Sequence, residues 1–305
     1  MTGNRLRDRV RDHFSYRGDA ADVWRGFDRL LDTEEFLNLG YSAWYQPHVV
    51  GSPQRRLADV VGRDLARRLD ENEPESTVAG ARLLDVGCGR GGPTVHLADR
   101  FGFDAVGVDL VPYNVTQARA NARERRRNRE RDPDRSGRTT FLVGDATALP
   151  VADDAVGACT ALDAVVYVPD KRTVFEEVAR VVRPGGVVWV TDLLVASDAD
   201  PAAREALAAF ADAWDMPDLV PVDEYLALVE AAGLTVESVR DLTPHSVGRF
   251  RKWTRLYLAL ADGIGGVLER VMRRWDLDPN AVTAQVRAAH RALPHLRHVA
   301  VVAER

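Results

Sequence analysis

Leu83-Leu84-Asp85-Val86-Gly87-Cys88-Gly89-Arg90-Gly91-Gly92 is the stretch that decides the fold of this chain. Its apolar beginning predicts a short buried strand, and the following segment, 93–100, is typical of a helix. A glycine-rich turn that leads into a helix N-terminus presents unpaired backbone N–H groups, and glycines let the backbone approach a ligand closely. The turn alone is also compatible with an ordinary tight connection, so the neighbouring segments must decide.

Alternating strand and helix patterns follow this turn. Apolar segments predict strands at 82–86, 104–109, 139–143, 156–161, 186–191, 234–242 and 298–303. Helical patterns between them cover 93–100, 112–128, 165–182, 201–214, 222–232 and 246–293. Nearly continuous apolar strands separated by helices favour a parallel sheet that is covered on both faces. We therefore expect an α/β fold with a doubly wound, seven-stranded, mostly parallel sheet.

The first 75 residues precede this pattern and are expected to be largely helical. Apolar residues recur at helical spacing in 20–31 and 54–69. The aromatic-rich stretch 36–46 between them is compatible with a loop packed on its own aromatics or with a lid over a ligand. We expect residues 1–75 to form an N-terminal helical lid or substrate segment and residues 76–305 to form the main domain. Within that domain, residues 245–295 are expected to form a helical cap inserted before the last strand.

Composition narrows the classes of function. The net charge is −5, which gives no general attraction to nucleic acid or to an anionic membrane. The two cysteines, Cys88 and Cys159, make neither a disulfide framework nor a metal cluster, so no metal is expected. The charged N-terminus lacks the apolar region of a secretory signal, and no stretch approaches the length of a membrane span. We expect a cytoplasmic protein without stable membrane insertion.

Carboxylates stand at the ends of successive predicted strands. Asp85 lies just before the glycine-rich turn, and Asp109, Asp145 and Asp163 stand at the ends of the next three strands. Ligands of open α/β sheets bind beyond the carboxyl ends of the strands. Asp109 could accept hydrogen bonds from ribose hydroxyls, and Asp145 could accept one from an exocyclic adenine amine. A single acid of this kind could be a helix N-cap, but acids at successive strand ends indicate a nucleoside site.

These motifs resemble those of class I S-adenosylmethionine-dependent methyltransferases. The resemblance covers about residues 81–192 and implies a Rossmann-like fold, S-adenosylmethionine as the cofactor and methyl transfer as the reaction. The matching segments are the first motif at 83–91, the ribose-binding strand end at 106–110, the adenine segment at 141–150, the helix region at 165–170 and the Arg-x-x-x-Pro-Gly-Gly turn at 180–186.

The segments outside this core resemble small-molecule methyltransferases, which include ubiquinone and menaquinone C-methyltransferases and macrolide and sugar O-methyltransferases. The resemblance implies that residues 1–50 and about 245–295 form the acceptor pocket. The acceptor would be a small molecule, such as a secondary metabolite, a lipid or a quinone-like compound, methylated on O, N or C. The resemblance is compatible with a homodimer. Two alternatives stay open: a cyclopropane-synthase-like or cyclase enzyme that uses the same donor, and a non-catalytic donor-binding partner.

The resemblance also assigns site residues. Donor binding falls to Asp85, Gly87, Cys88, Gly89, Gly91, Asp109, Leu110, Asp145, Ala146, Ala161 and Tyr41. An oxygen or nitrogen acceptor has to lose a proton, and the candidate bases are His245, Tyr167, Asp163 and His48. His245 follows the sixth predicted strand and is expected to face the pocket. Tyr167 stands where the family often has histidine. The remaining histidines near the last strand, His298 among them, show no metal-ligand spacing and are expected to pack or to lie at the surface.

Overall fold

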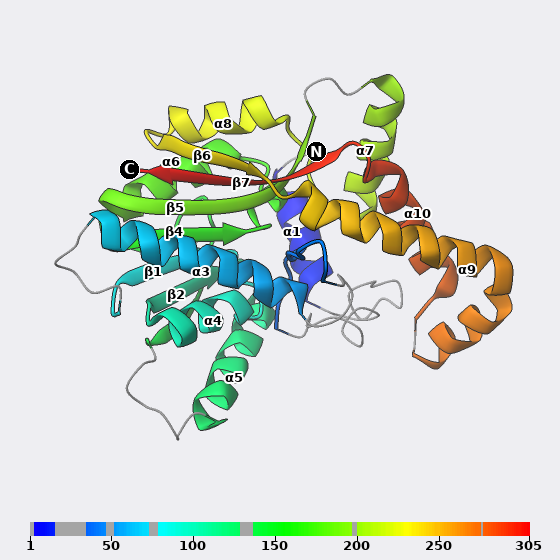
Figure 1. Ribbon diagram of the computed structural model, residues 1–305, viewed down its shortest axis with the longest axis horizontal. Coiled ribbons are helices and arrows are strands. Elements are labelled where there is room, and N and C mark those ends of the chain that lie inside the picture. Colours follow the sequence, from blue (N-terminus) through cyan, green and yellow to red (C-terminus); the bar gives the residue numbers. More distant parts are fainter. Residues whose placement is uncertain are drawn as a thin grey trace.

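Figure 1 shows the computed structural model of the protein. The structure describes residues 3–15, 35–46, 52–72, 79–128, 137–196, 200–275 and 277–305. The predicted helix at 20–31 and the candidate base His48 lie outside the described residues.

The centre of the fold is a seven-stranded sheet with the strand order β3-β2-β1-β4-β5-β7-β6. Strands β1 to β5 pair in parallel, and β7 runs antiparallel to both of its neighbours. The predicted doubly wound, mostly parallel sheet is therefore confirmed. The strands are β1 (Arg82–Val86), β2 (Asp104–Asp109), β3 (Thr139–Val143), β4 (Val156–Leu162), β5 (Val182–Val195), β6 (Thr235–Asp241) and β7 (Leu296–Glu304).

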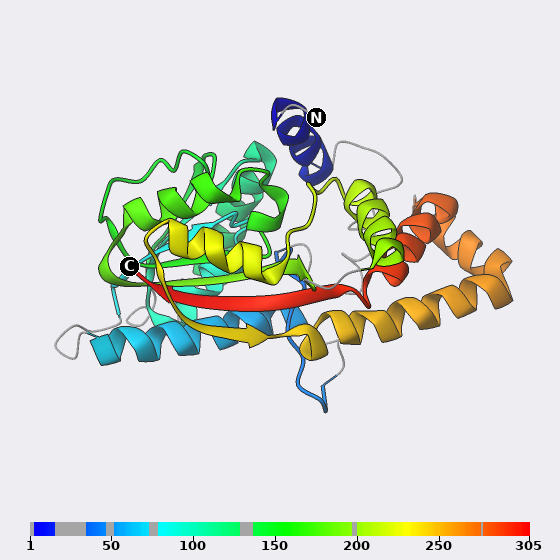
Figure 2. The same ribbon diagram turned by 90° about the horizontal axis from the view of Figure 1, so that it is seen from above.

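Helices cover both faces of this sheet (Figure 2). Helices α3 (Pro53–Asn72), α4 (Gly92–Phe101) and α5 (Pro112–Asn128) lie on one face, and α6 (Lys171–Val181) and α8 (Val222–Ala231) lie on the other. Because successive strand residues point to opposite faces, Leu83 packs under α3 and α4 while Leu84 packs under α6. Trp189 of β5 is fully buried beneath α3. Two apolar cores therefore hold the sheet rigid between its helices.

A helical cap extends past one end of the sheet. It contains α7 (Pro201–Ala213), α9 (Val247–Arg274) and α10 (Pro279–Ala292), and the last two stand between β6 and β7 (Figure 1). These helices share an apolar core that includes Phe210, Trp214 and Leu293. Helix α1 (Gly3–Phe14) lies near the junction of the cap and the sheet. Within the described residues, no helix combines the length and the apolar character that crossing a membrane requires.

Three predicted elements differ from the structure. The predicted helix at 165–182 is wrong in its first part, because Val165–Tyr167 forms one 3-10 turn and α6 begins at Lys171. Pro169 has no N–H to continue the helix, and the Asp170 side chain caps α6 by accepting from Thr173 N. The predicted helix at 246–293 is two helices, because Asp278 caps a new helix whose first residue is proline. Strand β5 is longer than predicted, since Gly185 and Gly186 pair with Arg305 at the chain end.

Candidate active site

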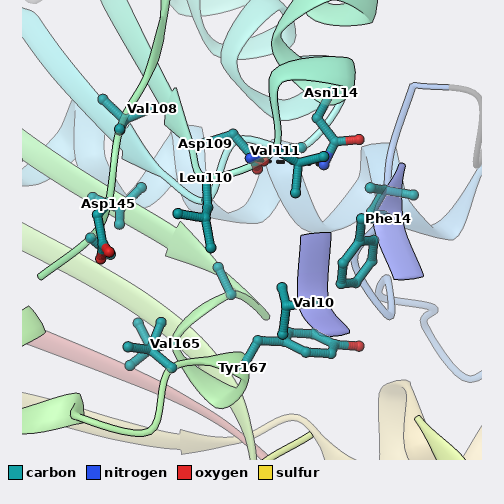
Figure 3. A pocket seen from close by; sticks show the side chains of 18 of the residues that line it. Val10, Phe14, Val108, Asp109, Leu110, Val111, Asn114, Asp145, Val165 and Tyr167 are labelled. Atoms are coloured by element: carbon teal, nitrogen blue, oxygen red, sulfur yellow. Dashed lines mark hydrogen bonds between the residues drawn. The ribbon is translucent and has the colours of Figure 1, made fainter. Parts of the chain in front are cut away.

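A pocket opens at the carboxyl ends of β1 to β4, where the strand order changes direction between β1 and β4 (Figure 3). The space measures about 940 Å³, including its open mouth. The lining residues come from the four strand ends, α1 and the loop around Leu37. They include Arg7, Val10, Phe14, Gly87, Gly89, Asp109, Leu110, Asn114, Asp145, Ala146, Asp163, Ala164 and Tyr167.

The glycine-rich turn forms the floor of this pocket. Gly87 has a φ of +68°, and a Cβ at this position would lie 2.4 Å from the Cβ of Ala164. Backbone N–H groups of Gly87 and Cys88 both donate to Val108 O, which fixes the turn against β2. Gly91 has a φ of +83° and precedes the first residue of α4. The pocket wall at Gly87 and Gly89 is therefore bare backbone, held in a conformation that side chains rarely adopt.

Asp109, at the end of β2, is held in the pocket wall by three hydrogen bonds. Its Oδ2 accepts from Gly89 N at 2.9 Å, and its Oδ1 accepts from Val111 N at 2.9 Å and from Asn114 Nδ2 at 3.1 Å. Burial raises the pKa of Asp109, and these three donors oppose the rise. The amide oxygen of Asn114 is buried and has no hydrogen-bond partner among the residues that the structure describes. Asp109 and Asn114 therefore stand side by side in the pocket lining, with the Asn114 amide nitrogen turned toward the carboxylate (Figure 3).

Asp145 follows β3 and lines the pocket beside the β2 end that carries Asp109. Its Oδ1 accepts from the backbone N and the hydroxyl of Thr147, at 2.9 and 2.7 Å. Its Oδ2 lies 3.2 Å from a guanidinium nitrogen of Arg7. Leu110 and Ala146 line the space between Asp109 and Asp145. The β2 and β3 ends thus form an acidic wall with an apolar surface between its two carboxylates.

Asp163 stands at the opposite wall, directly after β4. It has a φ of +57°, and its side chain is 7% exposed. Its Oδ1 lies 2.8 Å from His298 Nε2, and its Oδ2 accepts from Leu39 N at 2.7 Å. Burial raises the pKa of Asp163, but His298 and the hydrogen bonds outweigh burial and hold it below its usual value. Asp163 is therefore an ionised carboxylate on the pocket wall.

Tyr167 lies beside Asp163 in the one-turn helix η2 (Val165–Tyr167). Its ring packs edge-on against Phe14 of α1, with ring centroids 5.0 Å apart. Burial, together with the charges of Asp163, Asp192 and Asp215, raises the pKa of Tyr167 well above its ordinary value. The phenol is therefore neutral at physiological pH, and Tyr167 is suited to shape the pocket rather than to remove a proton.

The structure does not bring all the predicted residues to the pocket. Asp85 is buried behind the glycine-rich turn, where it accepts from Thr94 Oγ1 at 2.5 Å and from Thr160 Oγ1 at 3.1 Å. Burial, against those two hydrogen bonds, raises the pKa of Asp85 to about 6. Its contacts hold β1, α4 and β4 together. The predicted donor ligands that lie in the core behind the pocket are Cys88, Gly91 and Ala161.

His245 and Tyr41 form a separate pair outside the pocket lining. Their rings stack with centroids 4.6 Å apart, and His245 Nδ1 lies 3.1 Å from Ser42 O. His245 follows strand β6 in the sequence, as expected. The one-turn helix η3 (Thr243–His245) then turns its imidazole toward the loop 35–46 instead of toward the pocket. The structure therefore gives these two residues a role in joining that loop to the cap.

Comparisons with known proteins identify the family of this chain. Residues 84–190 match the family model described as a methyltransferase domain. Methyltransferase GfsG of Streptomyces halstedii is 32% identical over 75% of this chain and 77% of its own length. This chain belongs to the methyltransferase family. The enzyme uses S-adenosylmethionine and methylates a small molecule.

Other similarities extend over most of the methyltransferase. The 27-O-demethylrifamycin SV methyltransferase of Amycolatopsis mediterranei is 27% identical over 93% of this chain and 97% of its own length. A crystal structure of geranyl diphosphate C-methyltransferase from Streptomyces coelicolor A3(2) has a TM-score of 0.66 at 18% identity, covering 98% of each chain. The [4+2]-cyclase SpnF has a TM-score of 0.61 at 21% identity, covering 87% of this chain and 86% of its own. These two structures show the same fold.

Residues 1–50 were expected to help form the acceptor pocket, but no residue of α1 was predicted to line it. Val10 and Phe14, one helical turn apart, are buried and line the pocket. Arg7 reaches Asp145, and Arg9 Nε donates to Asp215 Oδ1 at 2.6 Å after α7. Helix α1 therefore connects the acidic wall at the β2 and β3 ends to the helical cap. The sequence signal for this helix face was the spacing of Val10 and Phe14, two apolar residues four positions apart in a charged segment.

Asp192 on β5 gives the methyltransferase a pH-dependent stability. Burial raises its pKa to about 7, against hydrogen bonds from Tyr225 Oη at 2.6 Å and Val166 N at 2.9 Å. Because the native carboxyl holds its proton more tightly than the unfolded one, its contribution to stability is lost as pH rises toward 7. The wild type should lose about 3 kcal/mol in its free energy of unfolding between about pH 5 and pH 8, whereas Asp192→Asn, which has no titrating group there, should not show this loss. Denaturant titrations across this range measure the difference, and parallel curves for the two proteins would contradict it.

Proposed function

We propose that the methyltransferase holds the nucleoside of its donor on the β2 and β3 wall and the methionine part along the Gly87–Gly89 turn. The two carboxylate oxygens of Asp109 keep lone pairs beyond those used by the backbone, and these suit the vicinal hydroxyls of a ribose. Asp145 would accept from the adenine amine, and Leu110 and Ala146 would contact the base. The bare backbone at Gly87 and Gly89 leaves room for the methionine part. The residues present therefore fit S-adenosylmethionine.

S-Adenosylmethionine supplies a methyl group that its sulfonium already activates. The chain has to bring the acceptor in line with that methyl group and keep water out. Val10, Phe14 and Tyr167 form an apolar surface on the acceptor side. Asp163 is the carboxylate on that side, and it would accept the hydrogen bond and then the proton of an acceptor hydroxyl.

This geometry favours an apolar small molecule that carries a hydroxyl group, methylated on oxygen. The observation that carries the proposal is the ionised carboxylate of Asp163, set beside the apolar residues of the pocket and opposite the donor residues. O-Methyltransferases among the relatives, including O-methyltransferase resE of Aspergillus sclerotiorum at 28% identity over 73% of this chain, support it. A homodimer, the absence of a nucleic-acid substrate and a cytoplasmic location stay predictions. The acidic net charge supports the second of these.

The test is product analysis with S-adenosylmethionine and a panel of hydroxylated apolar acceptors. O-Methylation predicts a product heavier by one CH2 whose hydroxyl is gone, together with S-adenosylhomocysteine. A ring-closed product with the hydroxyl intact would favour the cyclopropane-synthase-like alternative, and an isomerised acceptor without S-adenosylhomocysteine would favour a cyclase. Donor binding without any product across the panel would favour a non-catalytic partner.

Two neighbouring substitutions separate the roles on the acceptor side. We expect Asp163→Asn to lower kcat by roughly 100-fold, because a neutral amide cannot take the acceptor proton. Tyr167→Phe should lower it by no more than about threefold, since the phenol stays protonated and only shapes the pocket. Single-turnover kinetics with an acceptor from the panel measures both. A loss as large in Tyr167→Phe as in Asp163→Asn would reverse the two assignments.

A further inference from the structure

A buried chain of hydrogen bonds runs from the pocket to the cap through His298. The His298 side chain is fully buried in β7 and lies outside the pocket lining. Its Nε2 lies 2.8 Å from Asp163 Oδ1, and its Nδ1 lies 2.7 Å from Ser246 Oγ. Ser246 is the residue just before α9, and its hydroxyl also lies 3.0 Å from Leu242 O. Three segments distant in sequence therefore meet at one imidazole.

The hydrogen-bonding inventory fixes the Nε2 side of this chain. An ionised carboxylate has no proton to give, so Nε2 of His298 carries the hydrogen and donates to Asp163. The Ser246 hydroxyl can donate to Nδ1 or accept from it, because Leu242 O offers its proton a second acceptor. The imidazole lies behind the carboxylate, so the negative end of the pair faces the pocket in either protonation state of Nδ1.

Asp163 is also placed to meet the reacting end of the donor. Asp109 and Asp145 occupy the β2 and β3 ends, while Asp163 lies beyond Gly87 at the β4 end, next to Ala164. A donor whose nucleoside lies against the first two acids directs its sulfur toward the third. The sulfonium of S-adenosylmethionine carries one positive charge more than the thioether of S-adenosylhomocysteine. A fixed carboxylate near the sulfur therefore distinguishes donor from product by charge.

We propose that His298 is a positioning residue that holds Asp163 as an ionised carboxylate facing the pocket, and that this carboxylate makes the site prefer the cationic donor to its neutral product. The proposal rests on the donor orientation proposed above. This role of Asp163 is separate from proton removal. The carboxylate would favour binding of S-adenosylmethionine before the acceptor arrives, and would favour release of S-adenosylhomocysteine after the reaction. Loss of the charge weakens the donor complex selectively, whereas loss of packing alone weakens both complexes equally.

Calorimetric dissociation constants for S-adenosylmethionine and S-adenosylhomocysteine test the first part without any acceptor. We expect Asp163→Asn to weaken donor binding about tenfold more than product binding. Asparagine is well tolerated at the positive φ of this position, so the fold should persist. Equal weakening of both ligands, or no weakening of either, would overturn the proposal. If the wild type binds neither ligand, the proposed donor site itself fails, and the two failures are thereby distinguished.

The role of His298 is tested by measuring how the preference for S-adenosylmethionine over S-adenosylhomocysteine depends on pH. In the wild type the preference should stay constant from about pH 5 to pH 8, since Asp163 is ionised throughout. In His298→Gln, Asp163 keeps its burial but loses the imidazole, so its pKa rises and the preference should decline as pH falls toward about 5. Asp192, Tyr167 and Tyr225 also interact electrostatically with Asp163, and all three are retained in both proteins. A flat profile in His298→Gln would overturn the role of His298.

His290 provides a matched control. Its Nδ1 lies 2.7 Å from Thr254 Oγ1 in the cap, the same kind of contact as His298 makes with Ser246, but it does not line the pocket. His290→Gln should leave the preference and its pH profile unchanged. If His298→Gln does not fold, nitrogen NMR of the histidine rings in the unaltered protein decides. Nε2 of His298 should carry the hydrogen that it donates to Asp163, and an unprotonated Nε2 would contradict the proposal.

Discussion

Replacing Asp109 with alanine should lower the affinity for S-adenosylhomocysteine by about a thousandfold, or roughly 4 kcal/mol. The carboxylate would accept a ribose hydroxyl, and each hydrogen bond to a charged group contributes roughly 1.5–3 kcal/mol. It also holds Gly89 N, Val111 N and the Asn114 amide in place, so its loss loosens the wall around the ribose. Titration calorimetry measures the affinity directly.

Asp104→Ala is the matched control for Asp109→Ala. Asp104 is the first residue of the same strand, at the amino ends of the parallel strands and away from the pocket. It pairs with Arg138 on the surface. Its removal should change the affinity by less than about twofold, because an exposed ion pair stabilises the fold only slightly. An Asp109→Ala protein that binds S-adenosylhomocysteine as tightly as the wild type would remove Asp109 from the donor site.

Replacing Gly87 with alanine should destabilise the protein by about 2–4 kcal/mol and should weaken S-adenosylhomocysteine binding as well. A φ of +68° costs a non-glycine residue about 1 kcal/mol. The added methyl would lie 2.4 Å from the Ala164 Cβ, and such overpacking costs roughly 1–3 kcal/mol more. Ala164 has no flexible end that can move aside, so the β1 and β4 turns must separate. Denaturant unfolding and calorimetry measure the two effects.

Gly233→Ala separates strain from crowding. Gly233 has a φ of +86°, but a Cβ there would have no atom within 4 Å. It should therefore show only the strain of about 1 kcal/mol and unchanged ligand affinity. Equal destabilisation by the two substitutions would mean that the contact between Gly87 and Ala164 does not constrain the pocket.

The sequence predicted the parts of the fold that depend on local patterns. Apolar strands, helix periodicity and the glycine-rich turn are properties of short segments, so the order of strands and helices could be derived from them. Gly87, Asp109 and Asp145 follow predicted strands, and parallel strands bring their carboxyl ends to one edge of a sheet. Their meeting at the pocket was therefore predictable, whereas their contacts with the donor stay predictions.

The remaining site residues depend on packing between distant segments. His298 meets Asp163 because β7 inserts antiparallel beside β5, and nothing in the sequence around His298 specifies that register. His245 follows a strand end as expected, but its ring turns to Tyr41 because the loop 35–46 packs there. Asn114 lies in the first turn of the helix after Asp109, and its place in the pocket lining and its hydrogen bond to Asp109 mark it as part of the site. Side-chain direction at a loop or a helix start is set by such contacts, which a single sequence does not display.

A crystal structure with bound S-adenosylhomocysteine tests the central claim most directly. We expect the ribose hydroxyls within hydrogen-bonding distance of the Asp109 carboxylate, and the adenine amine at Asp145. The sulfur should face Asp163, with Tyr167 beside it and open space toward α1 for the acceptor. A ligand bound away from the strand ends, or bound with its sulfur toward Asp145 and its adenine toward Asp163, would contradict the account.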